Sequence, residues 1–389
     1  MRRLGRMAAG AAGLLLAGAT ITAASAAPAS AAPVREAASS GGRVVYVTNS
    51  ANAGGTGNVA RFAVTGAGTL TPVDALPTGE TAGTRAMAFT PDGRFGYVAD
   101  TLLNRILRVR IGPDGALTRL GTVATRAPFA MAMSPDGRTL YASNLGSRAV
   151  SVFAVGRRGG LLPRDAVDTG AENSKGVAVT PDGRFLYVSH GTPADTARTV
   201  LTGFALRADG SAGRRVAKAA IGVSGAETVI TPDGRFVYVV NQVSDDVHGF
   251  RIAASGALRP VPGSPMPGGD FPEGAAISPD GHRLYVAAVG VGDGPDAVPG
   301  QVLGFAIGDD GGLTETVPRT SMSSPIGIGF APGGRRVYVS DFTDSIVNTF
   351  AVGPGGALRL LQTVPSQGPR PAFHSVNVPP APRPSRASA

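Results

Sequence analysis

Short segments that alternate small, apolar and polar residues follow one another along most of this chain. Residues 176–180 alternate small residues with valine, 181–183 are the turn residues Pro-Asp-Gly, and 184–189 extend again. Residues 200–206 form a third segment of this kind, and an Asp-Gly turn precedes an expected fourth at about 215–221. Apolar residues with a period of two, bounded by Pro, Asp and Gly, predict four short β-strands joined by tight turns.

This four-stranded unit recurs along the chain, and a tyrosine marks each copy. The sequence has seven tyrosines, each at the same place in the second strand of its unit: Tyr46, Tyr97, Tyr141, Tyr187, Tyr238, Tyr285 and Tyr338. They are spaced 44 to 53 residues apart. Strand-like units with a period of about 40 to 50 residues are typical of propeller blades. The pattern predicts an all-β fold, a seven-bladed β-propeller of four-stranded blades.

The two ends of the repeat complement each other. The repeat opens with a second strand at residues 44–48 that no first strand precedes, while residues 374–378 match 175–179 position for position. We therefore expect the N- and C-terminal strands to pair, which closes the ring and removes free sheet edges. Because each blade packs only on its neighbours, a single propeller domain then spans residues 43–378.

The segments outside the propeller predict an exported protein. Residues 1–31 combine three arginines, an apolar run and small residues, which is the pattern of a secretory signal peptide. Residues 32–42 are expected to be a linker and 379–389 a Pro-rich disordered tail. The chain has no cysteine for a lipid anchor and no later apolar stretch long enough to cross a membrane. We expect a secreted, extracellular protein with no membrane span once the signal is removed, by either the general secretory or the twin-arginine route.

The charge of the chain narrows the range of partners. The net charge is +9, and three of the positive charges belong to the predicted signal peptide. The chain has no tryptophan and no basic run interleaved with aromatic residues, so nucleic acid is not an expected partner. The remaining basic excess leaves a cell-wall polymer or a protein as alternatives. We expect a monomer without a cofactor.

Several motifs together resemble a known family. These are Tyr-Val-Thr-Asn at residues 46–49, the repeated Thr/Ser-Pro-Asp-Gly turn, and third strands with a phenylalanine near their end. The combination resembles the lactonase-type seven-bladed β-propellers with YVTN repeats, which include propeller 6-phosphogluconolactonases and carboxymuconate cyclases. The resemblance covers essentially all of the chain from residue 43 to 378. Because its motifs are architectural, it implies the fold more strongly than the reaction.

The resemblance also implies a site. In that family a histidine, two arginines and a glutamate around the central mouth hold the lactone or carboxylate. By repeat register these positions are Lys175 for the histidine, Ala226 and Ile326 for the arginines, and Gln242 for the glutamate. None of the four family side chains is kept. A register shift of one residue would place Glu227 at the position of Ala226, but it would supply no arginine, so the family's sugar-phosphate chemistry is not expected unchanged.

A ring of side chains is expected where the innermost strands begin, at the channel mouth. Twelve residues before each tyrosine from Tyr97 onward, together with the equivalent in the closing strand, stand Arg85, Phe129, Lys175, Ala226, Glu273, Ile326 and His374. As catalytic residues, His374 or Glu227 would activate water, and Arg85 or Lys175 would stabilise an oxyanion. Glu273 would bind the ligand, as a base or as a charge partner. The alternative is that these charges neutralise one another around a wet channel.

A second ring lies three residues after each tyrosine and is polar in every blade but one. Its members are Asn49, Asp100, Asn144, His190, Asn241, Ala288 and Asp341. As ligand-binding residues, together with Gln242, the amides would form hydrogen bonds and His190 would supply a titratable group. The alternative is that Asn and Asp cap turns here by bonding their own backbone.

A third ring, three residues before each tyrosine, is cationic and belongs to the opposite face. It consists of Arg43, Arg94, Arg138, Arg184, Arg235, His282 and Arg335. Such a ring is suited to a polyanion. The interpretation we favour is that each arginine pairs with the aspartate two residues earlier, as Arg94 with Asp92, and adds little beyond solubility.

Two longer loops, residues 191–199 and 290–300, break the regular spacing, as loops that carry specificity often do. Asp293 and Asp296 in the second loop match no specific calcium-ligand spacing. The sequence has no His/Cys cluster for zinc, no nucleophile elbow and no phosphate loop. No metal site is expected.

These observations lead to one main interpretation and one alternative. The main interpretation is a secreted lactonase-family propeller that binds a small polar or anionic, lactone-like ligand at the central channel mouth, with its hydrolysis left open. The alternative is a non-catalytic propeller that serves as a scaffold for a protein or the cell wall.

Overall fold

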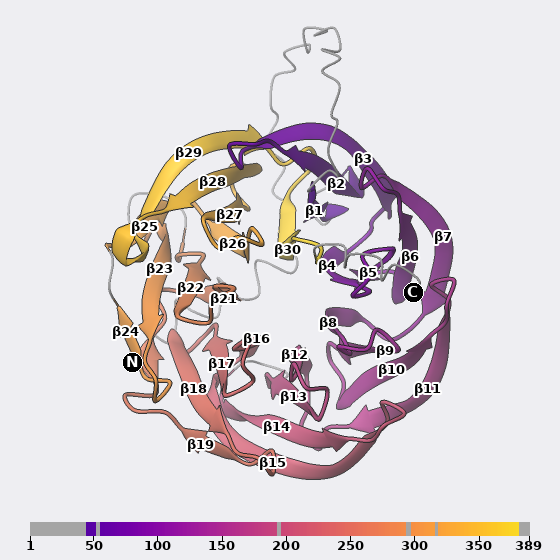
Figure 1. Ribbon diagram of the computed structural model, residues 1–389, viewed down its shortest axis with the longest axis vertical. Helices are drawn as coiled ribbons and strands as arrows, with labels where there is room; N and C mark the ends of the chain where they lie inside the picture. The colour runs from indigo at the N-terminus through magenta and orange to yellow at the C-terminus, as the bar shows by residue number, and fades with distance from the viewer. Residues whose placement is uncertain (1–43, 52–54, 193–195, 293–296, 316–317, 381–389) are drawn as a thin grey trace, which may run out of the picture.

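The computed structural model describes residues 44–51, 55–192, 196–292, 297–315 and 318–380. These residues form seven antiparallel sheets arranged as blades around a central axis (Figure 1). The predicted signal peptide and linker, and most of the predicted tail, lie outside the described residues. The prediction of a seven-bladed propeller is confirmed.

Each blade contains four main strands, which follow one another from the axis outward. Blade 1 consists of β30 (Pro371–Asn377), β1 (Val44–Asn49), β2 (Thr56–Val64) and β3 (Leu70–Glu80). Blade 2 consists of β4 (Thr84–Phe89), β5 (Phe95–Asp100), β6 (Arg105–Ile111) and β7 (Leu117–Ala124). Blade 3 consists of β8 (Pro128–Met133), β9 (Thr139–Asn144), β10 (Ala149–Val155) and β11 (Leu161–Asp168). Blade 4 consists of β12 (Ser174–Val179), β13 (Phe185–His190), β14 (Arg198–Leu206) and β15 (Ala212–Val223).

The last three blades follow the same order, and two of them split their outer strand. Blade 5 consists of β16 (Gly225–Ile230), β17 (Phe236–Asn241), β18 (Asp246–Ile252) and β19 (Leu258–Pro260), with β20 (Met266–Pro267) also on β18. Blade 6 consists of β21 (Pro272–Ile277), β22 (Arg283–Ala288), β23 (Gly300–Ile307) and β24 (Leu313–Glu315), with β25 (Thr320–Met322) also on β23. Blade 7 consists of β26 (Pro325–Phe330), β27 (Arg336–Asp341), β28 (Ile346–Val352) and β29 (Leu358–Pro365), with the 3₁₀ turn η2 (Pro354–Gly356) before β29.

The ring closes through the two ends of the chain, as predicted. Strand β30 pairs antiparallel with β1, and Tyr46 lies opposite Asn377. The C-terminal strand is therefore the innermost strand of the blade that the N-terminal strands build (Figure 1). Strands β1 and β2 therefore each have a neighbouring strand on both sides. Neither offers a free edge on which a strand of another molecule could pair.

Small residues in the inner strands let the blades approach one another near the axis. At Gly176 on β12, an added Cβ would lie 2.9 Å from the backbone nitrogen of Thr228 on the next blade. A contact that short would force the backbone to shift, so a residue with a side chain does not fit there. The alternation of small residues in the first strand of each unit thus reflects the tapering space around the axis.

Each repeat tyrosine joins its blade to the next one. The Tyr46 hydroxyl donates to the carbonyl of Gly115 at 2.6 Å, and the Tyr187 hydroxyl to that of Gly256 at 2.9 Å. The cycle is completed by the pairs Tyr97–Gly159, Tyr141–Gly210, Tyr238–Gly311, Tyr285–Gly356 and Tyr338–Gly68. All seven tyrosines are at most 1% exposed. We call this cycle the tyrosine-glycine latch; it explains why tyrosine, and not phenylalanine, recurs at these positions.

The glycine of each latch lies in the turn between the third and fourth strands. At Gly256 the backbone has a φ of 83°, and an added Cβ would lie 2.5 Å from the Phe185 ring of the preceding blade. The turn therefore requires glycine both for its left-handed backbone and for close packing. Burial raises the pKa of Tyr97 and Tyr141 to about 12, so the latch hydroxyls remain protonated donors.

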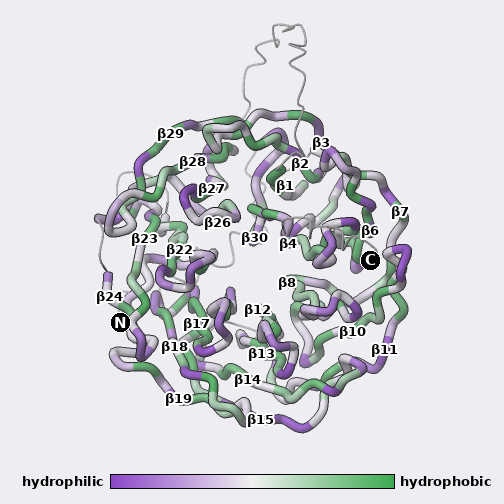
Figure 2. The backbone as a smooth tube through the Cα atoms, viewed as in Figure 1, coloured by the Kyte–Doolittle hydropathy of each residue, from purple (hydrophilic) through white to green (hydrophobic). Residues whose placement is uncertain are grey.

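The hydrophobic core lies between neighbouring blades. Each of seven clusters combines residues of two adjacent blades, such as Tyr187 with Val237, Val239 and Phe250. Polar residues recur along the outer strands, for example β11 and β15 (Figure 2). Each blade thus buries its faces against its neighbours and presents its outer edge to solvent, as expected for a radial repeat.

Candidate functional site

The predicted first ring lies at one end of the channel, and backbone bulges position its side chains. The pairing of each inner strand shifts register there; on β21, for example, the shift falls between Pro272 and Gly274. Such bulges re-aim side chains at the rims of sheets and beside active sites. We call the ring members Arg85, Phe129, Lys175, Glu273 and His374 the mouth layer. Arg85, Phe129, Lys175 and Glu273 are 1% to 5% exposed.

A cavity of about 140 Å³ lies on the channel axis next to the mouth layer. Its walls come from the inner strands of all seven blades and include Met87, Met131 and Val177. Glu227 and His374 are the titratable residues that line it. The volume is below the roughly 300 to 1,000 Å³ of sites for drug-sized ligands, so the cavity suits a small molecule.

His374 and Glu227 form an ion pair across the channel, from β30 of blade 1 to β16 of blade 5. His374 Nδ1 lies 2.8 Å from Glu227 Oε2, which also accepts a hydrogen bond from the Ala275 amide at 3.4 Å. The other ring nitrogen of His374, Nε2, is buried and has no hydrogen-bond partner among the described residues. Burial acts to lower the pKa of His374, but the charge of the Glu227 carboxylate and its hydrogen bond to Nδ1 outweigh burial and leave the pKa raised. His374 is thus oriented by a carboxylate and has one nitrogen without a hydrogen-bond partner in the part of the chain that the structure describes.

Glu227 differs from the residues at the equivalent position of the other blades. In the pairing of β16 with β17, Glu227 lies opposite Val240 and Thr228 opposite Val239, so Glu227 is one residue beyond the ring position and there is no register slip. The equivalent residues of the other blades are small: Ala86, Ala130, Gly176, Gly274, Gly327 and Ser375. A single large, charged residue at a position that is otherwise Gly, Ala or Ser is the sequence signal that marks Glu227.

A chain of buried hydrogen bonds links Lys175 to Glu273. Lys175 Nζ donates to Ser224 Oγ and, at 3.1 Å, to Gln242 Oε1. Ser224 Oγ donates to the same Gln242 oxygen at 2.7 Å, and Gln242 Nε2 donates to Glu273 Oε1. Burial raises the pKa of Glu273 to about 8, against the lowering effect of Lys175, His374 and Arg85 and of the Gln242 hydrogen bond. The chain connects blades 4, 5 and 6 at the mouth.

The guanidinium of Arg85 is stacked between two aromatic rings. Its Cζ lies 4.9 Å from the Phe129 centroid and 4.5 Å from the Phe373 centroid, and Nε donates to Thr101 Oγ1 at 3.0 Å. Its terminal nitrogens have no hydrogen-bond or ion-pair partner among the described residues. Burial lowers the pKa of Arg85 to about 10, with Glu273 opposing that shift. Arg85 is therefore a fixed cation whose two terminal nitrogens are left to donate to a ligand.

Three contributors to this site were missed by the sequence reasoning. Phe373 precedes His374 and packs on Phe129 with ring centroids 6.1 Å apart, while Thr101 and Ser224 hold Arg85 and Lys175. None of the three stands at a ring position, so the repeat register offers no signal for them. They become visible only when the blades are assembled.

The second ring lies behind the mouth, and its described contacts are structural. Asp100 accepts hydrogen bonds from the Gly83 amide at 2.9 Å and from Arg105 Nε at 2.9 Å, and Asn241 donates to Asp246 at 2.8 Å. Asn49, Asn144 and Asp341 are also at most 3% exposed: Asn49 bonds the Ser366 carbonyl at 3.0 Å, Asn144 bonds Ser151 Oγ at 2.8 Å, and Asp341 accepts from the Ser324 amide at 2.9 Å. The contacts support the alternative of turn caps rather than the ligand-binding interpretation.

His190 is enclosed in blade 4 with no exposed surface. Its Nε2 lies 3.0 Å from Thr202 Oγ1 on the neighbouring strand. Burial lowers the pKa of His190 to about 4, so the ring is neutral at physiological pH. In this arrangement His190 does not reach the cavity that His374 and Glu227 line.

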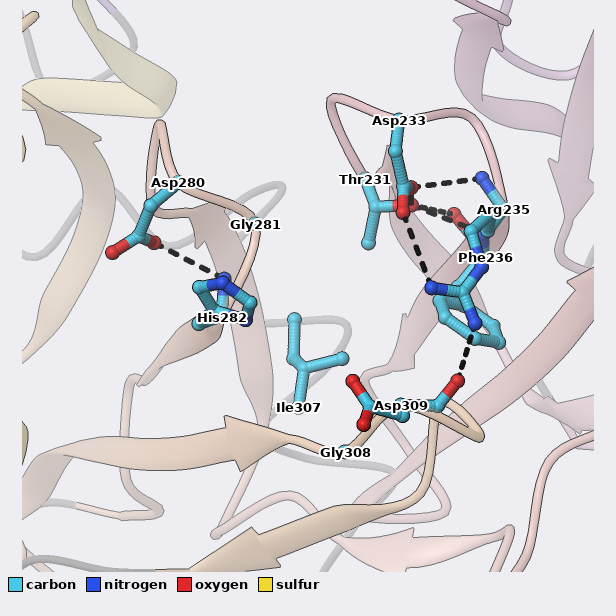
Figure 3. Close-up of a pocket in the computed structure, with 10 residues that line it drawn as sticks. All are labelled: Thr231, Asp233, Arg235, Phe236, Asp280, Gly281, His282, Ile307, Gly308 and Asp309. Atoms are coloured by element: carbon cyan, nitrogen blue, oxygen red, sulfur yellow. Dashed lines mark hydrogen bonds and ion pairs between the residues drawn. The ribbon is translucent and has the colours of Figure 1, made fainter.

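On the opposite face, three members of the cationic ring make the pairs that we favoured. Arg94, Arg184 and Arg235 each lie 3.7 Å from the aspartate two residues earlier. Figure 3 shows Arg235 between Asp233 and the main-chain carbonyl of Asp309 on the next blade, to which it donates. The cavity beside it, next to His282, measures only about 60 Å³. These arginines stabilise turns and blade contacts; Arg43 lies outside the described residues.

Neither a metal centre nor a membrane-crossing element is seen in the described part of the chain. It contains no group of three or more His, Asp or Glu residues that could hold a metal ion. It also contains no helix long and apolar enough to span a bilayer. Asp293 and Asp296, considered above as calcium ligands, lie outside the described residues.

Comparison with known proteins shows the family to which this chain belongs. The family model described as Lactonase, 7-bladed beta-propeller, matches residues 37–202 and 208–290, more than half of the chain. The chain belongs to this lactonase family. A 6-phosphogluconolactonase of Enterobacter sp. (strain 638) is 27% identical over 255 residues, which cover 60% of this chain and 72% of that protein. The comparisons favour the lactonase interpretation over the scaffold alternative.

Solved structures share the lactonase-family architecture. The periplasmic gluconolactonase PpgL of Pseudomonas aeruginosa superposes with a TM-score of 0.69 at 21% identity, over 88% of this chain and 100% of that one. A candidate 6-phosphogluconolactonase of Bacteroides uniformis gives 0.70 at 17% identity, over 88% and 99%. At these identities the likeness shows the fold alone.

Within the lactonase fold, this chain arranges its charged residues in its own way. The positions that the resemblance implies for the two arginines hold Ala226 and Ile326, both fully buried. The histidine that lines the cavity is His374 of blade 1, and the buried guanidinium of the mouth layer is that of Arg85 in blade 2. Because all blades present equivalent positions to one axis, a similar set of chemical groups can be assembled from different blades.

Proposed function

We propose that this protein hydrolyses a small, polar lactone in the cavity beside the mouth layer. The observation that carries the proposal is the His374–Glu227 pair, in which Nδ1 is held at 2.8 Å and Nε2 is buried without a partner among the described residues, at the wall of a small cavity. A histidine oriented by a carboxylate, with its second nitrogen available, is the arrangement of a general base. Membership of the lactonase family supports this choice of reaction.

The reaction can be written with the residues of this site. Neutral His374 accepts a proton from water at Nε2, and the resulting hydroxide oxygen bonds to the lactone carbonyl carbon. Arg85, with its two terminal nitrogens, and Lys175 favour the negative charge that develops on the carbonyl oxygen. The ring C–O bond then breaks, and its electron pair stays on the alkoxide oxygen, which takes up a proton to give the hydroxy acid.

This mechanism fixes the sign of the pH dependence. Only the neutral form of His374 accepts a proton, so the rate should rise with pH through the raised pKa of His374. Glu227→Gln removes a carboxylate that raises that pKa. The acid limb of the kcat/KM profile should therefore move to lower pH, with a reduced maximum because the ring loses its orienting charge. An unshifted acid limb in an active Glu227→Gln variant would contradict this assignment.

The main experiment is proton release, followed in a pH-stat, from a panel of sugar lactones and simple five- and six-membered lactones. His374→Asn removes the base and suits the backbone, because His374 has a φ of 54° and Asn tolerates that region. We expect its kcat/KM to fall by about 10²- to 10⁴-fold. The matched control is His282→Asn on the opposite face, which should retain wild-type activity. Lack of turnover across the panel by folded wild-type protein would overturn the proposal.

We also propose that the protein acts outside the cytoplasm. The support is the pattern of residues 1–31, an arginine-containing start followed by an apolar run and small residues. The test is mass spectrometry of the N-terminus of protein recovered from the medium or the cell envelope of an expressing bacterium. A new N-terminus near residue 31 is expected, and intact protein confined to the cytoplasm would refute export.

A further inference from the structure

The charges of the propeller are distributed unevenly around the ring. Blades 2 to 4, residues 84–223, contain 19 Arg and Lys but only 10 Asp and Glu. Blades 5 to 7, residues 225–365, contain 8 Arg and Lys and 14 Asp and Glu. The two parts of the ring therefore carry net charges of opposite sign.

The positive charge of blades 2 to 4 lies on the surface. Among their described residues, 15 Arg and Lys side chains are exposed, against 8 Asp and Glu. The acidic charge of blades 5 to 7 is in part internal, because Glu273 and Asp341 are 1% exposed and Glu227 faces the cavity. The exposed charges of these blades number 5 basic and 6 acidic among the described residues, so they nearly cancel. The ring thus has a basic side without a matching acidic side.

An arginine occupies the same level of the outer strand in blades 2, 3 and 4. Arg119 on β7, Arg164 on β11 and Arg215 on β15 are exposed, and each lies opposite, or one residue from, the third-strand position that pairs with the residue before the repeat tyrosine. These three strands follow one another around the outer edge of the ring (Figure 1). The equivalent positions of the other blades hold no cation; they are Pro72, Pro260, Glu315 and Leu360.

Further arginines stand in and beside the turns that link these blades. Arg157 and Arg158 are in the turn from β10 to β11, whose Gly159 carbonyl accepts the latch hydrogen bond from blade 2. Arg214 is next to Arg215 near the start of β15, and the turn before it is latched to blade 3 in the same way. Because each turn packs on the preceding blade, these arginines form a stripe across three blades. We call this stripe the basic rim: Arg119, Arg157, Arg158, Arg164, Arg214 and Arg215.

No ion pair within the described residues neutralises the basic rim. Arg119 and Arg164 donate to the main-chain carbonyls of Pro77 and Asp209 on neighbouring blades, which positions the guanidinium groups and leaves their charge in place. The other four have no hydrogen-bond partner among the described residues. Asp165 and Asp209 are the exposed carboxylates beside the stripe, so the six cations exceed the anions next to them. Such an excess produces a positive potential that attracts anions.

We propose that the basic rim binds a linear polymer of phosphate groups. A guanidinium binds two oxygens of one phosphate through its parallel N–H donors, and the stripe presents several such groups in succession. A small anion would contact only one or two of these arginines, whereas a polymer contacts arginines of all three blades and gains affinity from each contact. The proposal does not depend on the proposed hydrolysis, because the basic rim lies on the outer edge of the ring and the cavity lies on its axis.

The surface around the basic rim fits other partners less well. Single-stranded nucleic acid is bound through aromatic side chains on which the bases stack, and no Phe or Tyr of the described residues is exposed. A bilayer surface is bound by inserted apolar side chains, and Leu162 is the one large apolar residue exposed on β7, β11 and β15. A second copy of this chain offers no acidic surface for the rim, because the exposed charges of blades 5 to 7 nearly cancel.

The test compares two triple variants that change the net charge equally. Arg157→Gln/Arg158→Gln/Arg214→Gln removes half of the basic rim. The matched control, Arg259→Gln/Arg335→Gln/Arg359→Gln, removes three exposed arginines of blades 5 and 7 that also have no ion pair among the described residues. Isothermal titration calorimetry measures the binding of inorganic polyphosphate at low salt. We expect the rim variant to weaken binding by about tenfold or more and the control by less than about threefold, and the wild-type affinity to fall as salt rises.

The outcomes separate the possible partners. Equal losses in the two variants would show attraction by net charge alone, and they would overturn the basic rim as a site, as would a lack of polyphosphate binding by wild-type protein. Tighter binding to phosphatidylglycerol vesicles or to a DNA duplex, at equal phosphate concentration, would assign the rim to a membrane or to nucleic acid instead. A dimer in sedimentation equilibrium that the rim variant loses would assign it to a second copy.

Circular dichroism checks that both triple variants are folded. If the rim variant does not fold, the single variants Arg158→Gln and Arg335→Gln make the same comparison. We then expect a loss of about twofold or more for Arg158→Gln and no measurable loss for Arg335→Gln. Equal effects of these two substitutions would overturn the proposal.

Discussion

The tyrosine-glycine latch and the mouth layer occupy neighbouring strands of the same blades and follow opposite rules. The latch has the same two residues in all seven blades, and every tyrosine donates to a glycine carbonyl of the next blade. The mouth layer differs from blade to blade, from Arg85 and Phe129 to Lys175, Glu273 and His374. Repetition therefore marks what holds the blades together, and departure from repetition marks what gives the channel its chemistry.

The two regions also differ in how they treat buried polar groups. The latch satisfies every tyrosine hydroxyl. The mouth layer leaves His374 Nε2 and Glu273 Oε2 without partners among the described residues. An unsatisfied buried polar atom costs about 1 to 3 kcal/mol, so the mouth is expected to lower stability where the latch raises it. Such a division between a stabilising framework and a costly site is common in proteins that carry a functional site.

The largest effect is expected from removing a latch side chain. Tyr187 has no exposed surface, and Tyr187→Ala would leave a large void between blades 4 and 5. We expect a loss of about 3 to 5 kcal/mol in the free energy of unfolding. Urea unfolding monitored by circular dichroism measures it. A free energy of unfolding within about 1 kcal/mol of the wild-type value would show that the latch contributes little to the stability of the fold.

The next largest effect tests how much stability the buried Glu273 carboxyl of the mouth layer costs. Because the pKa of Glu273 is about 8 in the folded protein and 4.5 is its ordinary value, the folded state keeps a proton that the unfolded chain releases. The contribution of Glu273 to wild-type stability should thus fall between about pH 4.5 and 8, by an amount on the order of a few kcal/mol. Glu273→Gln should lack this fall and gain relative to wild type at about pH 9 compared with about pH 5. A pH-independent difference between the two proteins would refute a protonated Glu273.

A finer change separates the latch hydroxyl from the latch ring. Tyr187→Phe keeps the packing and removes the 2.9 Å hydrogen bond to Gly256. We expect a loss of about 1 kcal/mol with unchanged lactone turnover. Tyr97→Phe, where the bond is 3.3 Å, should lose less and serves as the matched comparison. Loss of activity without loss of stability in Tyr187→Phe would contradict the assignment of stability to the latch and of chemistry to the mouth layer.

The smallest effect is expected at the cationic ring. Arg184 is 57% exposed in its side chain and lies 3.7 Å from Asp182. Arg184→Gln should change the free energy of unfolding by less than about 0.5 kcal/mol, since exposed pairs are weak and screened by salt. Thermal melts at low and high salt measure this. A strongly salt-dependent loss would give the ring a larger structural role than we assign to it.

Much of the fold and part of the site were predictable from the sequence. The seven tyrosines, the Pro-Asp-Gly turns and the match of residues 374–378 to 175–179 predict the number of blades, the inner strand and the ring closure. The same register brings Arg85, Lys175, Glu273 and His374 to one end of the channel. The sequence alone does not assign the second ring, because Asn and Asp at strand ends suit both ligand binding and turn capping. The burial of Asp100 and Asn241 favours turn capping.

The sequence by itself determined the architecture, because period-two alternation and turn residues act locally and recur in every unit. Only the tertiary structure decided which charges meet. The pairing of His374 with Glu227 joins residues 147 positions apart across the channel axis, and the sandwich of Arg85 between Phe129 and Phe373 needs three blades. Burial of Glu273, which keeps its proton, depends on the same convergence. A repeat register fixes the height of a side chain along the axis, but the side chains it meets across that axis depend on the diameter and closure of the ring.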